Sequence, residues 1–305
     1  MREHDAFGPA TARRGRRKFD DDEATFVKLG RGEPALAEEP DLPETGDRWS
    51  TWDGALHGPH PRPEWIRTEH AAVDTELGML KTGKEADVFL VRREIPGTGQ
   101  LSMIAAKRYR DGDHRLFHRD AGYLEGRRVR RSREMRAMNT RTAFGKQLIA
   151  GQWAQAEFGA LSRLWQVGQE GGTISVPYPV QLIGTELMLE FIGDWETGEA
   201  APRLAQVRTD HDGLADLWRQ MTDALSVLAR TQIAHGDLSP YNTLVHQGRL
   251  VIIDMPQIVD LIANPQGAEF LARDVRNVAG WFTSRGLAVD TEGLIERLSY
   301  EAGLL

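Results

Sequence analysis

The chain has 305 residues, a hydrophobic fraction of 40% and a formal net charge of -7. This length suits one large or two modest domains, and the acidic balance argues against nucleic-acid binding over the whole surface. The lack of cysteine excludes disulfides and thiolate metal sites. We see no signal-peptide pattern and no apolar run of membrane-spanning length, so we expect a cytoplasmic protein with no membrane partner.

Residues 1–66 are rich in glycine, proline and charge and show little apolar periodicity. Such a segment buries too little surface to offset its ordering entropy. We therefore expect a largely disordered N-terminal extension and a fold that begins near residue 67. Trp49, Trp52 and Trp65 are exceptions. They either anchor the end of the extension on the folded part or lie on the surface as loop aromatics.

Residues 77–91 predict two strands joined by a glycine-containing turn. The turn consists of Thr82, Gly83, Lys84 and Glu85. Backbone N–H groups around a glycine can bind phosphate oxygens, and Lys84 would add positive charge. The same residues also suit an ordinary hairpin turn, so the turn alone does not decide between the two.

Lys107 ends the apolar strand expected at residues 101–109. In the kinase pattern, a lysine at this place pairs with the α- and β-phosphates of a nucleotide. The periodicity of residues 147–165 predicts a helix that carries Glu157. Glu157 then either forms an ion pair with Lys107 in the nucleotide site or faces water.

A long polar insertion at residues 110–145 separates this strand from this helix. Arginines cluster around Ser132 between residues 127 and 136. Insertions of this length in compact domains are usually functional or mobile. The insertion either contacts RNA, phosphate or an acidic protein, or is a solvated loop. Ser132 is the residue that we expect to be autophosphorylated, because flanking arginines could hold the transferred phosphate.

The apolar run of residues 186–193 ends in glycine, which suits a strand that enters a hinge between two lobes. An extended hinge offers backbone N–H and C=O groups to the edge of an adenine. Met188 would then pack beneath the base, or would simply fill the core.

The stretch from His235 to Asp254 carries the strongest catalytic signal. Asp237 and Asn242 lie five positions apart, and Asp254 ends a later apolar strand, which is the spacing of a kinase catalytic loop and its metal-binding aspartate. Residues 243–245 and 250–253 predict a hairpin that brings Asn242 close to Asp254. We expect Asp237 to act on the acceptor hydroxyl, and Asn242 and Asp254 to bind Mg²⁺.

Helices are predicted at residues 214–232, 268–282 and 292–301 from their apolar periodicity. The first of them precedes the catalytic loop. Only a short stretch separates Asp254 from the second, which leaves little room for a long activation loop or a peptide-docking platform.

Taken together, the motifs resemble the RIO family of atypical protein kinases, in particular its RIO1-like branch and a bacterial-type member of it. The resemblance covers roughly residues 75 to 285. Its motifs are residues 81–88, 105–107, 153–157, 188–193, 201–204, 235–242 and 252–257.

The resemblance implies an α+β fold of the bilobal protein-kinase type without a long activation loop. A small β-rich N-lobe would span residues 67–191 and include the insertion, and a mostly helical C-lobe would span residues 192–305. It also implies ATP with Mg²⁺ or Mn²⁺, autophosphorylation, and adenine contacts through the backbone of Glu190 and Ile192. In the family, the residue that matches Asp254 is implicated in an aspartyl-phosphate intermediate.

Several functions stay open at this point. The first is a serine/threonine protein kinase, and the second is an ATPase-type assembly factor. RIO1-like relatives are linked to ribosome maturation, so a ribosomal small-subunit particle or RNA is the expected partner of the arginine-rich insertion. A small-molecule phosphotransferase of the aminoglycoside-kinase kind is the third, because it shares the His-Gly-Asp-Leu pattern. The intact Lys107, Asp237, Asn242 and Asp254 argue against a pseudokinase.

Two positions depart from ordinary protein kinases. Gly236 stands where they have arginine, and Met255-Pro256 stands where they have Phe-Gly. The short stretch after Asp254, with its little room for an activation loop or a peptide-docking platform, puts ordinary peptide phosphorylation in doubt.

Overall fold

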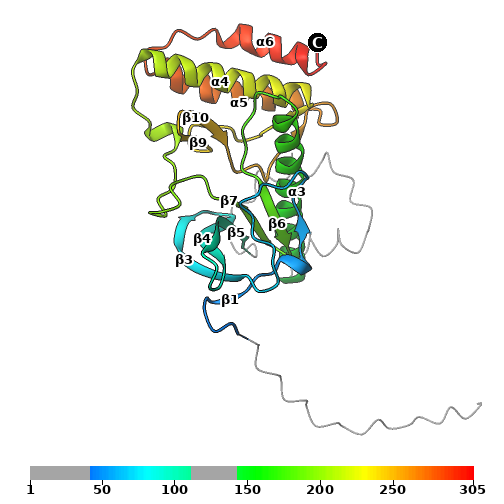
Figure 1. Cartoon of the computed structure of the whole chain (residues 1–305). Coiled ribbons are helices and arrows are strands. Elements are labelled where there is room, and N and C mark those ends of the chain that lie inside the picture. Colours follow the sequence, from blue (N-terminus) through cyan, green and yellow to red (C-terminus); the bar gives the residue numbers. More distant parts are fainter. Residues whose placement is uncertain (1–41, 111–142) are drawn as a thin grey trace, which may run out of the picture. The chain divides into compact units, whose positions relative to one another are not determined.

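A computed structural model describes residues 42–110 and 143–305 of the protein. In these ranges an antiparallel sheet comes first and helices predominate after it, which agrees with the expected α+β class (Figure 1). The predicted insertion, including Ser132, lies almost wholly outside the described residues.

The sheet has seven strands in the order β1-β3-β4-β5-β7-β6-β2. All neighbouring strands pair antiparallel. The five strands at its centre are β3 (Val73–Thr82), β4 (Ala86–Ile95), β5 (Gln100–Tyr109), β6 (Pro179–Ile183) and β7 (Glu186–Glu190). The predicted strands at residues 77–91 and 101–109 are therefore present, and β3 and β4 each extend further than expected.

The two edge strands come from the part of the chain that sequence analysis assigns to a disordered extension. β1 (Arg48–Trp49) pairs with β3, and β2 (Leu56–His57) pairs with β6. Between them the short 3₁₀ helix η1 (Trp52–Gly54) buries the Trp52 side chain. The fold thus begins well before residue 67. The composition is misleading here because a few anchoring contacts, rather than a periodic apolar face, hold the segment.

Trp52 packs on the face of the sheet that we call the outer face. Its buried neighbours there are Ile66, Val91, Ile104, Ala106, Tyr178, Val180 and Met188. A fully buried Arg93 lies on the same side and forms a bidentate pair with Asp74, with distances of 2.7 and 3.0 Å. Gln181 accepts a further bond from Arg93 at 2.7 Å, so the buried guanidinium is well compensated.

The helix α3 (Ala143–Gln169) runs alongside the sheet and reaches the helical part of the chain (Figure 1). The helical part contains α4 (His211–Arg230), α5 (Gly267–Thr283), α6 (Thr291–Glu301) and the short η3 (Leu204–Gln206). The helices α3, α4, α5 and α6 match the predicted ranges to within a few residues, whereas η3 was not predicted. Asp210 caps α4 and Asp290 caps α6, each accepting a backbone N–H three residues on.

Two small antiparallel sheets lie against these helices. The predicted hairpin is formed by β9 (Thr243–His246) and β10 (Arg249–Ile252). β8 (Ile233–Ala234) pairs with β11 (Val259–Asp260), which fixes both ends of the stretch between them. None of the helices in the described ranges combines the length and apolarity that a bilayer crossing requires.

We predict that Trp52→Ala lowers the free energy of unfolding by about 3 kcal/mol, because it removes a large side chain buried on the outer face. The matched control is Leu56→Ala on β2, where the side chain is 56% exposed. This control should change stability by less than about 0.5 kcal/mol. Urea denaturation measures both. An effect of Trp52→Ala as small as the one expected for the control would show that the Trp52 side chain does not stabilise the core.

Candidate functional site

A cavity of about 770 Å³ lies between the inner face of the sheet and the helical part. Most residues predicted for the site line it: Gly83, Lys84, Glu85, Lys107, Glu157, Glu190, Ile192, Asp237, Asn242 and Asp254. They come from the β3–β4 turn, β5, α3, the end of β7, the catalytic loop and the end of the β9–β10 hairpin. Residues that lie between positions 83 and 254 thus converge on one space.

Met188 is a correction to the prediction. It is fully buried on the outer face, where Arg93 contacts its sulfur, and it does not line the cavity. Leu189 lines the cavity in its place. Successive side chains of a strand point to opposite faces, so an error of one residue moves the predicted contact to the wrong side of the sheet.

Thr82 also lies outside the cavity lining. Its hydroxyl donates to Asp87 at 2.6 Å and accepts from Arg110 at 2.7 Å. Arg110 in turn holds Asp87, and this pair lowers the pKa of the Asp87 carboxyl. Thr82 therefore stabilises the base of the turn, in contrast to the predicted contact with the nucleotide.

Glu157 is fully buried on α3 and is contacted from β5 and from the segment after Asp254. Lys107 Nζ donates to its two carboxylate oxygens at 2.9 and 2.7 Å. The Tyr109 hydroxyl donates to the same carboxylate, and the Met255 N–H donates to it at 2.9 Å. The expected Lys107–Glu157 ion pair is thus present, and it is tied to the residue that follows Asp254.

Lys107 also donates to Asp254 Oδ1 at 2.6 Å. Burial alone would lower the pKa of Lys107, but the carboxylates of Asp254 and Glu157 raise it above its ordinary value. Burial alone would raise the pKa of Asp254, but Lys107 and Lys81 lower it. Lys107 and Asp254 therefore stay charged at neutral pH, as a phosphate-binding lysine and a metal-binding carboxylate require.

The hairpin places Asn242 beside Asp254 as predicted, because the Ile253 N–H donates to the Asn242 carbonyl at 3.0 Å. Asn242 Nδ2 donates to the Asp237 carbonyl at 3.0 Å, so its amide oxygen is turned away from that bond. Asp254 has a φ of 68°, in the left-handed region. Aspartate tolerates this conformation better than most residues. In this conformation the Asp254 carboxylate contacts both Lys107 and Lys81.

The catalytic loop is held from behind by Asp274 on α5. This buried carboxylate accepts the N–H groups of Gly236 and Leu238 at 2.8 and 3.0 Å. Gly236 has a φ of 84°, and a Cβ there would lie 2.4 Å from the Gln257 carbonyl oxygen, so only glycine fits. Asp237 itself remains exposed at the cavity, open to an acceptor.

His235 fixes the loop from the other side. Its Nε2 lies 3.0 Å from the Ile253 carbonyl, and its Nδ1 accepts the Asp237 N–H at 3.3 Å. These two contacts fit the tautomer with the proton on Nε2. The ring thus links the catalytic loop to the segment that follows β10 and carries Asp254.

Four residues at the site were not predicted from the sequence: Tyr109, Asp274, Leu189 and Lys81. Tyr109 follows Lys107 by two residues, so both side chains lie on one face of β5. Asp274 interrupts the apolar face of α5, and an acidic residue at such a position is a recognisable signal. The contribution of Lys81 depends on an irregular strand, which no local pattern indicates.

The cavity has an apolar part and a charged part, which suit the base and the phosphates of a nucleotide. Leu80, Val88, Ala105, Leu189 and Ile253 form an apolar part that suits a base. Lysine and carboxylate groups form the other part. In the described ranges there is no cluster of three acidic, histidine or cysteine side chains that would hold a metal alone. Two oxygen ligands, Asn242 and Asp254, fit a Mg²⁺ ion whose remaining ligands are phosphate oxygens and water.

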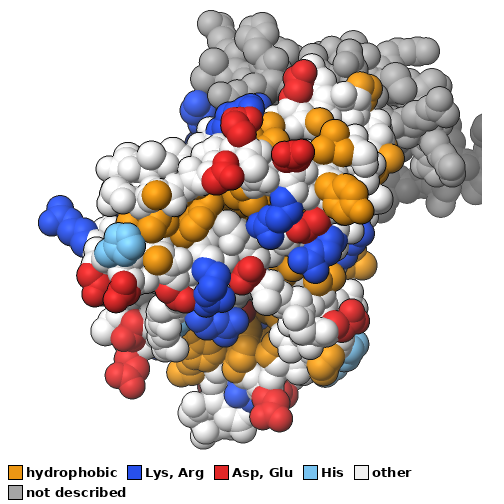
Figure 2. All heavy atoms as spheres, turned by 90° about the horizontal axis from the view of Figure 1, so that it is seen from above, with side chains coloured by type: hydrophobic (Ala, Val, Ile, Leu, Met, Phe, Trp, Pro, Cys, Tyr) orange, Lys and Arg blue, Asp and Glu red, His pale blue; other side chains and the backbone are white. Residues whose placement is uncertain are grey.

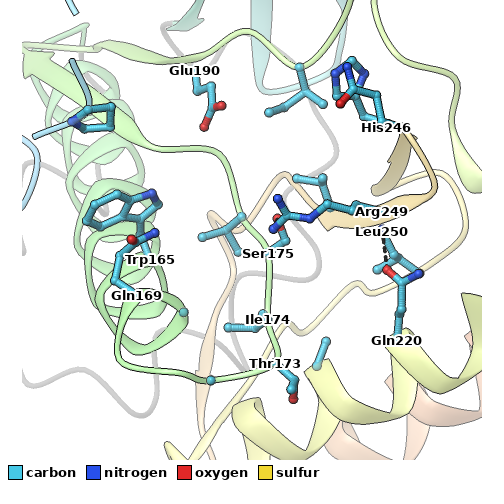
Figure 3. Close-up of a pocket in the computed structure, with 18 of the residues that line it drawn as sticks. Trp165, Gln169, Thr173, Ile174, Ser175, Glu190, Gln220, His246, Arg249 and Leu250 are labelled. Carbon is cyan, nitrogen blue, oxygen red and sulfur yellow. Dashed lines mark hydrogen bonds between the residues drawn. The ribbon is translucent and has the colours of Figure 1, made fainter. Parts of the chain in front are cut away.

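A second cavity, of about 700 Å³, lies behind the hinge (Figure 3). Glu190 and Ile192 line both cavities. In Figure 3 the side chains of Glu190 and Arg249 point into the open space of the rear cavity. Burial raises the pKa of Glu190, although the Tyr178 N–H donates to its carboxylate at 3.0 Å. The Glu190 side chain is thus turned towards the rear cavity.

Comparison with known proteins now gives the family. The RIO domain matches residues 100–294. The chain belongs to the RIO family. The RIO-type serine/threonine-protein kinase Rio1 of Haloferax volcanii is 33% identical over 232 residues, which cover 76% of this chain and 71% of that protein.

Two eukaryotic RIO proteins are also similar. Serine/threonine-protein kinase RIO1 of Saccharomyces cerevisiae is 28% identical over 72% of this chain and 46% of that protein. Serine/threonine-protein kinase RIO3 of Mus musculus is 29% identical over 75% of this chain and 42% of that protein. The chain spans less than half the length of these two. By its family and these relatives it is a RIO-type serine/threonine protein kinase, and the expected bacterial type has no support among them.

The Lys107–Glu157 pair in this RIO domain yields a prediction. Lys107→Ala and Glu157→Gln should each slow phosphoryl transfer, because the first removes the ammonium group and the second releases it from its fixed place. The double variant should lose little more than either single variant, since one interaction is removed in all three. Single-turnover rates with labelled ATP measure this, with thermal unfolding as the control for folding. Additive losses would mean that the two side chains act separately.

Proposed function

We propose that this RIO-type kinase transfers the γ-phosphoryl group of ATP to a hydroxyl group and phosphorylates itself. Asp237 would orient and deprotonate the acceptor, and Lys107 would bind phosphate oxygens. Asn242 and Asp254 would bind Mg²⁺, or Mn²⁺ in its place, and the bound metal would offset phosphate charge. One observation carries this proposal: Lys107 joins Glu157 and Asp254 within 2.9 Å in the cavity that Asp237 and Asn242 also line.

The hinge supports an adenine at the apolar part of the cavity. The Glu190 N–H already donates to the Tyr178 carbonyl at 2.8 Å, and the Ala201 N–H donates to the Ile192 carbonyl at 2.9 Å. The Glu190 carbonyl and the Ile192 N–H are not used in these two bonds. We infer that they contact the adenine edge, with Leu189 at the wall of the base site.

The division into two lobes, before and after residues 191–192, is part of this proposal. The N-lobe would include the strands from residue 48 on, in addition to the expected range 67–191. The protein-kinase-like arrangement without a long activation loop is supported by the short stretch of residues 255–266, which leads from Asp254 directly to α5. The cytoplasmic location stays a prediction.

We place the chain in the RIO1-like branch on its motifs. The proposed partner is a ribosomal small-subunit particle or its RNA, bound through the arginine-rich segment around Ser132. The helical face in Figure 2 shows acidic and basic side chains interspersed. Ion pairs such as Arg230–Glu301 and Arg276–Glu292 balance charge on the helices. A mixed surface of this kind favours contact through one basic segment over contact through the whole face.

Incubation with γ-labelled ATP, with and without ribosomal subunits, tests the function. Label on serine or threonine of the protein supports the kinase, and mass spectrometry then tests Ser132 as the site. Free phosphate without labelled protein would instead support the ATPase-type assembly factor. In a parallel incubation with an added aminoglycoside, labelled aminoglycoside together with unlabelled protein would favour the small-molecule phosphotransferase.

We predict that Asp237→Ala slows phosphoryl transfer by about 10²- to 10⁴-fold, because it removes the group that acts on the acceptor. ATP binding should stay within about tenfold of the parent, since base, phosphate and metal contacts lie elsewhere. Autophosphorylation is followed with labelled ATP, and binding with a fluorescent nucleotide. Wild-type autophosphorylation by this variant would remove Asp237 from the catalytic role.

Asp254→Ala and Asn242→Ala should both weaken the metal-dependent part of ATP binding, because each removes an oxygen ligand. Nucleotide binding is titrated against Mg²⁺ for the variants and the parent. A control is Asp260→Ala in β11, an exposed aspartate away from the cavity. The assignment fails if the variants need the same metal concentration as the parent and the control.

A further inference from the structure

Lys81 reaches the nucleotide cavity because of an irregularity in β3. Met79 pairs with Phe89 on β4, but Lys81 pairs with Val88, so β3 carries one extra residue between these two pairs. With regular pairing, Lys81 and Met79 would share one face, and the Met79 side chain is 56% exposed. The bulge turns Lys81 to the opposite side.

The register across the sheet shows which side that is. Val88 pairs with Lys81 on one neighbouring strand and with Lys107 on the other. Residues paired directly across strands present their side chains on the same face. Lys81, Val88 and Lys107 therefore form one row, and all three line the cavity. The bulge thus adds a second lysine beside the lysine that the kinase pattern requires.

The two lysines divide the Asp254 carboxylate between them. Lys107 Nζ lies 2.6 Å from Oδ1, and Lys81 Nζ lies 3.1 Å from Oδ2. Lys107 is nearly buried, with 8% of its side chain exposed, and Glu157 also holds it. The Lys81 side chain is 32% exposed, and in the part of the chain that the structure describes Asp254 is the partner found for it. Lys81 is therefore the lysine that can be displaced from the Asp254 carboxylate.

Lys81 binds Oδ2 of Asp254, a carboxylate oxygen that could otherwise bind a metal ion. A divalent cation on Asp254 and the ammonium of Lys81 would compete for the same carboxylate, and their like charges would repel each other. A lysine displaced from Asp254 remains at the phosphate end of the cavity, where a triphosphate supplies several anionic oxygens.

Resting on the proposed function, we propose that Lys81 is a second phosphate-binding residue that occupies the metal side of Asp254 until Mg²⁺ and ATP bind. In the nucleotide-free protein it connects β3 to the segment after β10 and neutralises charge on the Oδ2 side of the Asp254 carboxylate. With nucleotide bound it contacts the phosphate groups and leaves Asp254 to the metal. Lys81 is thus a specificity-determining residue that favours nucleotides over nucleosides.

The test compares Lys81→Met, Lys81→Arg and the control Arg92→Met. Arg92 lies on β4 outside the cavity and pairs with Glu94. Binding of ATP, ADP and adenosine is measured by displacement of a fluorescent nucleotide in saturating Mg²⁺, because Lys81 leaves Asp254 only when the metal binds. Lys81→Met should bind ATP roughly ten- to hundredfold more weakly, because a charge-assisted hydrogen bond is lost. Adenosine binding should not change, and Lys81→Arg and Arg92→Met should bind all three like the parent.

A second measurement addresses the competition for Asp254. Mn²⁺ binding to nucleotide-free protein, followed by electron paramagnetic resonance, should be tighter in Lys81→Met than in the parent, because the competing ammonium is gone. Thermal unfolding verifies that each variant is folded. Unchanged ATP affinity, an equal loss for ATP and adenosine, or weaker Mn²⁺ binding would each overturn the role of Lys81. A parent protein that binds no ATP would overturn the proposed function itself, which separates the two failures.

Discussion

The buried carboxylate of Glu157 is the interaction on which the rest of the site depends. Alone in the core it would be very unfavourable, and it is tolerated because Lys107, Tyr109 and the Met255 N–H surround it. These partners come from the sheet and from the segment after Asp254, so the charge can be satisfied only when sheet, α3 and catalytic segment come together. The cost of burying one charge therefore enforces the geometry of the whole site.

The catalytic end of the cavity was predictable because its signals are local. The spacing of Asp237 and Asn242 and the hairpin before Asp254 are short-range patterns, and their elements appear with nearly the predicted bounds. The hinge strand was predicted as well, but not which of its faces meets the cavity. Met188 and Leu189 are both apolar, so alternation gives no register, and only the packing of Trp52 on the outer face decides between them.

Other features depend on contacts between distant residues and have no local signal. The Arg93–Asp74 pair is buried within the sheet, although charged residues are expected on a surface. Residues 48–57 resemble a disordered tail in composition, yet they pair with both edges of the sheet. Lys81 enters the site through a bulge, and an extra residue in a strand cannot be recognised until its partner strand is known.

The placement of β1 and β2 has a consequence for how the protein is made. The two strands are neighbours in the chain but lie on opposite edges of the sheet, so the segment between them crosses its outer face. β1 and β2 leave the ribosome early, whereas the partner of β2 is β6, at residues 179–183. Until β6 emerges, one edge of the growing sheet stays open and the surface that Trp52 covers is incomplete. During synthesis, this open edge is where the unfinished chain is most exposed to pairing with other chains.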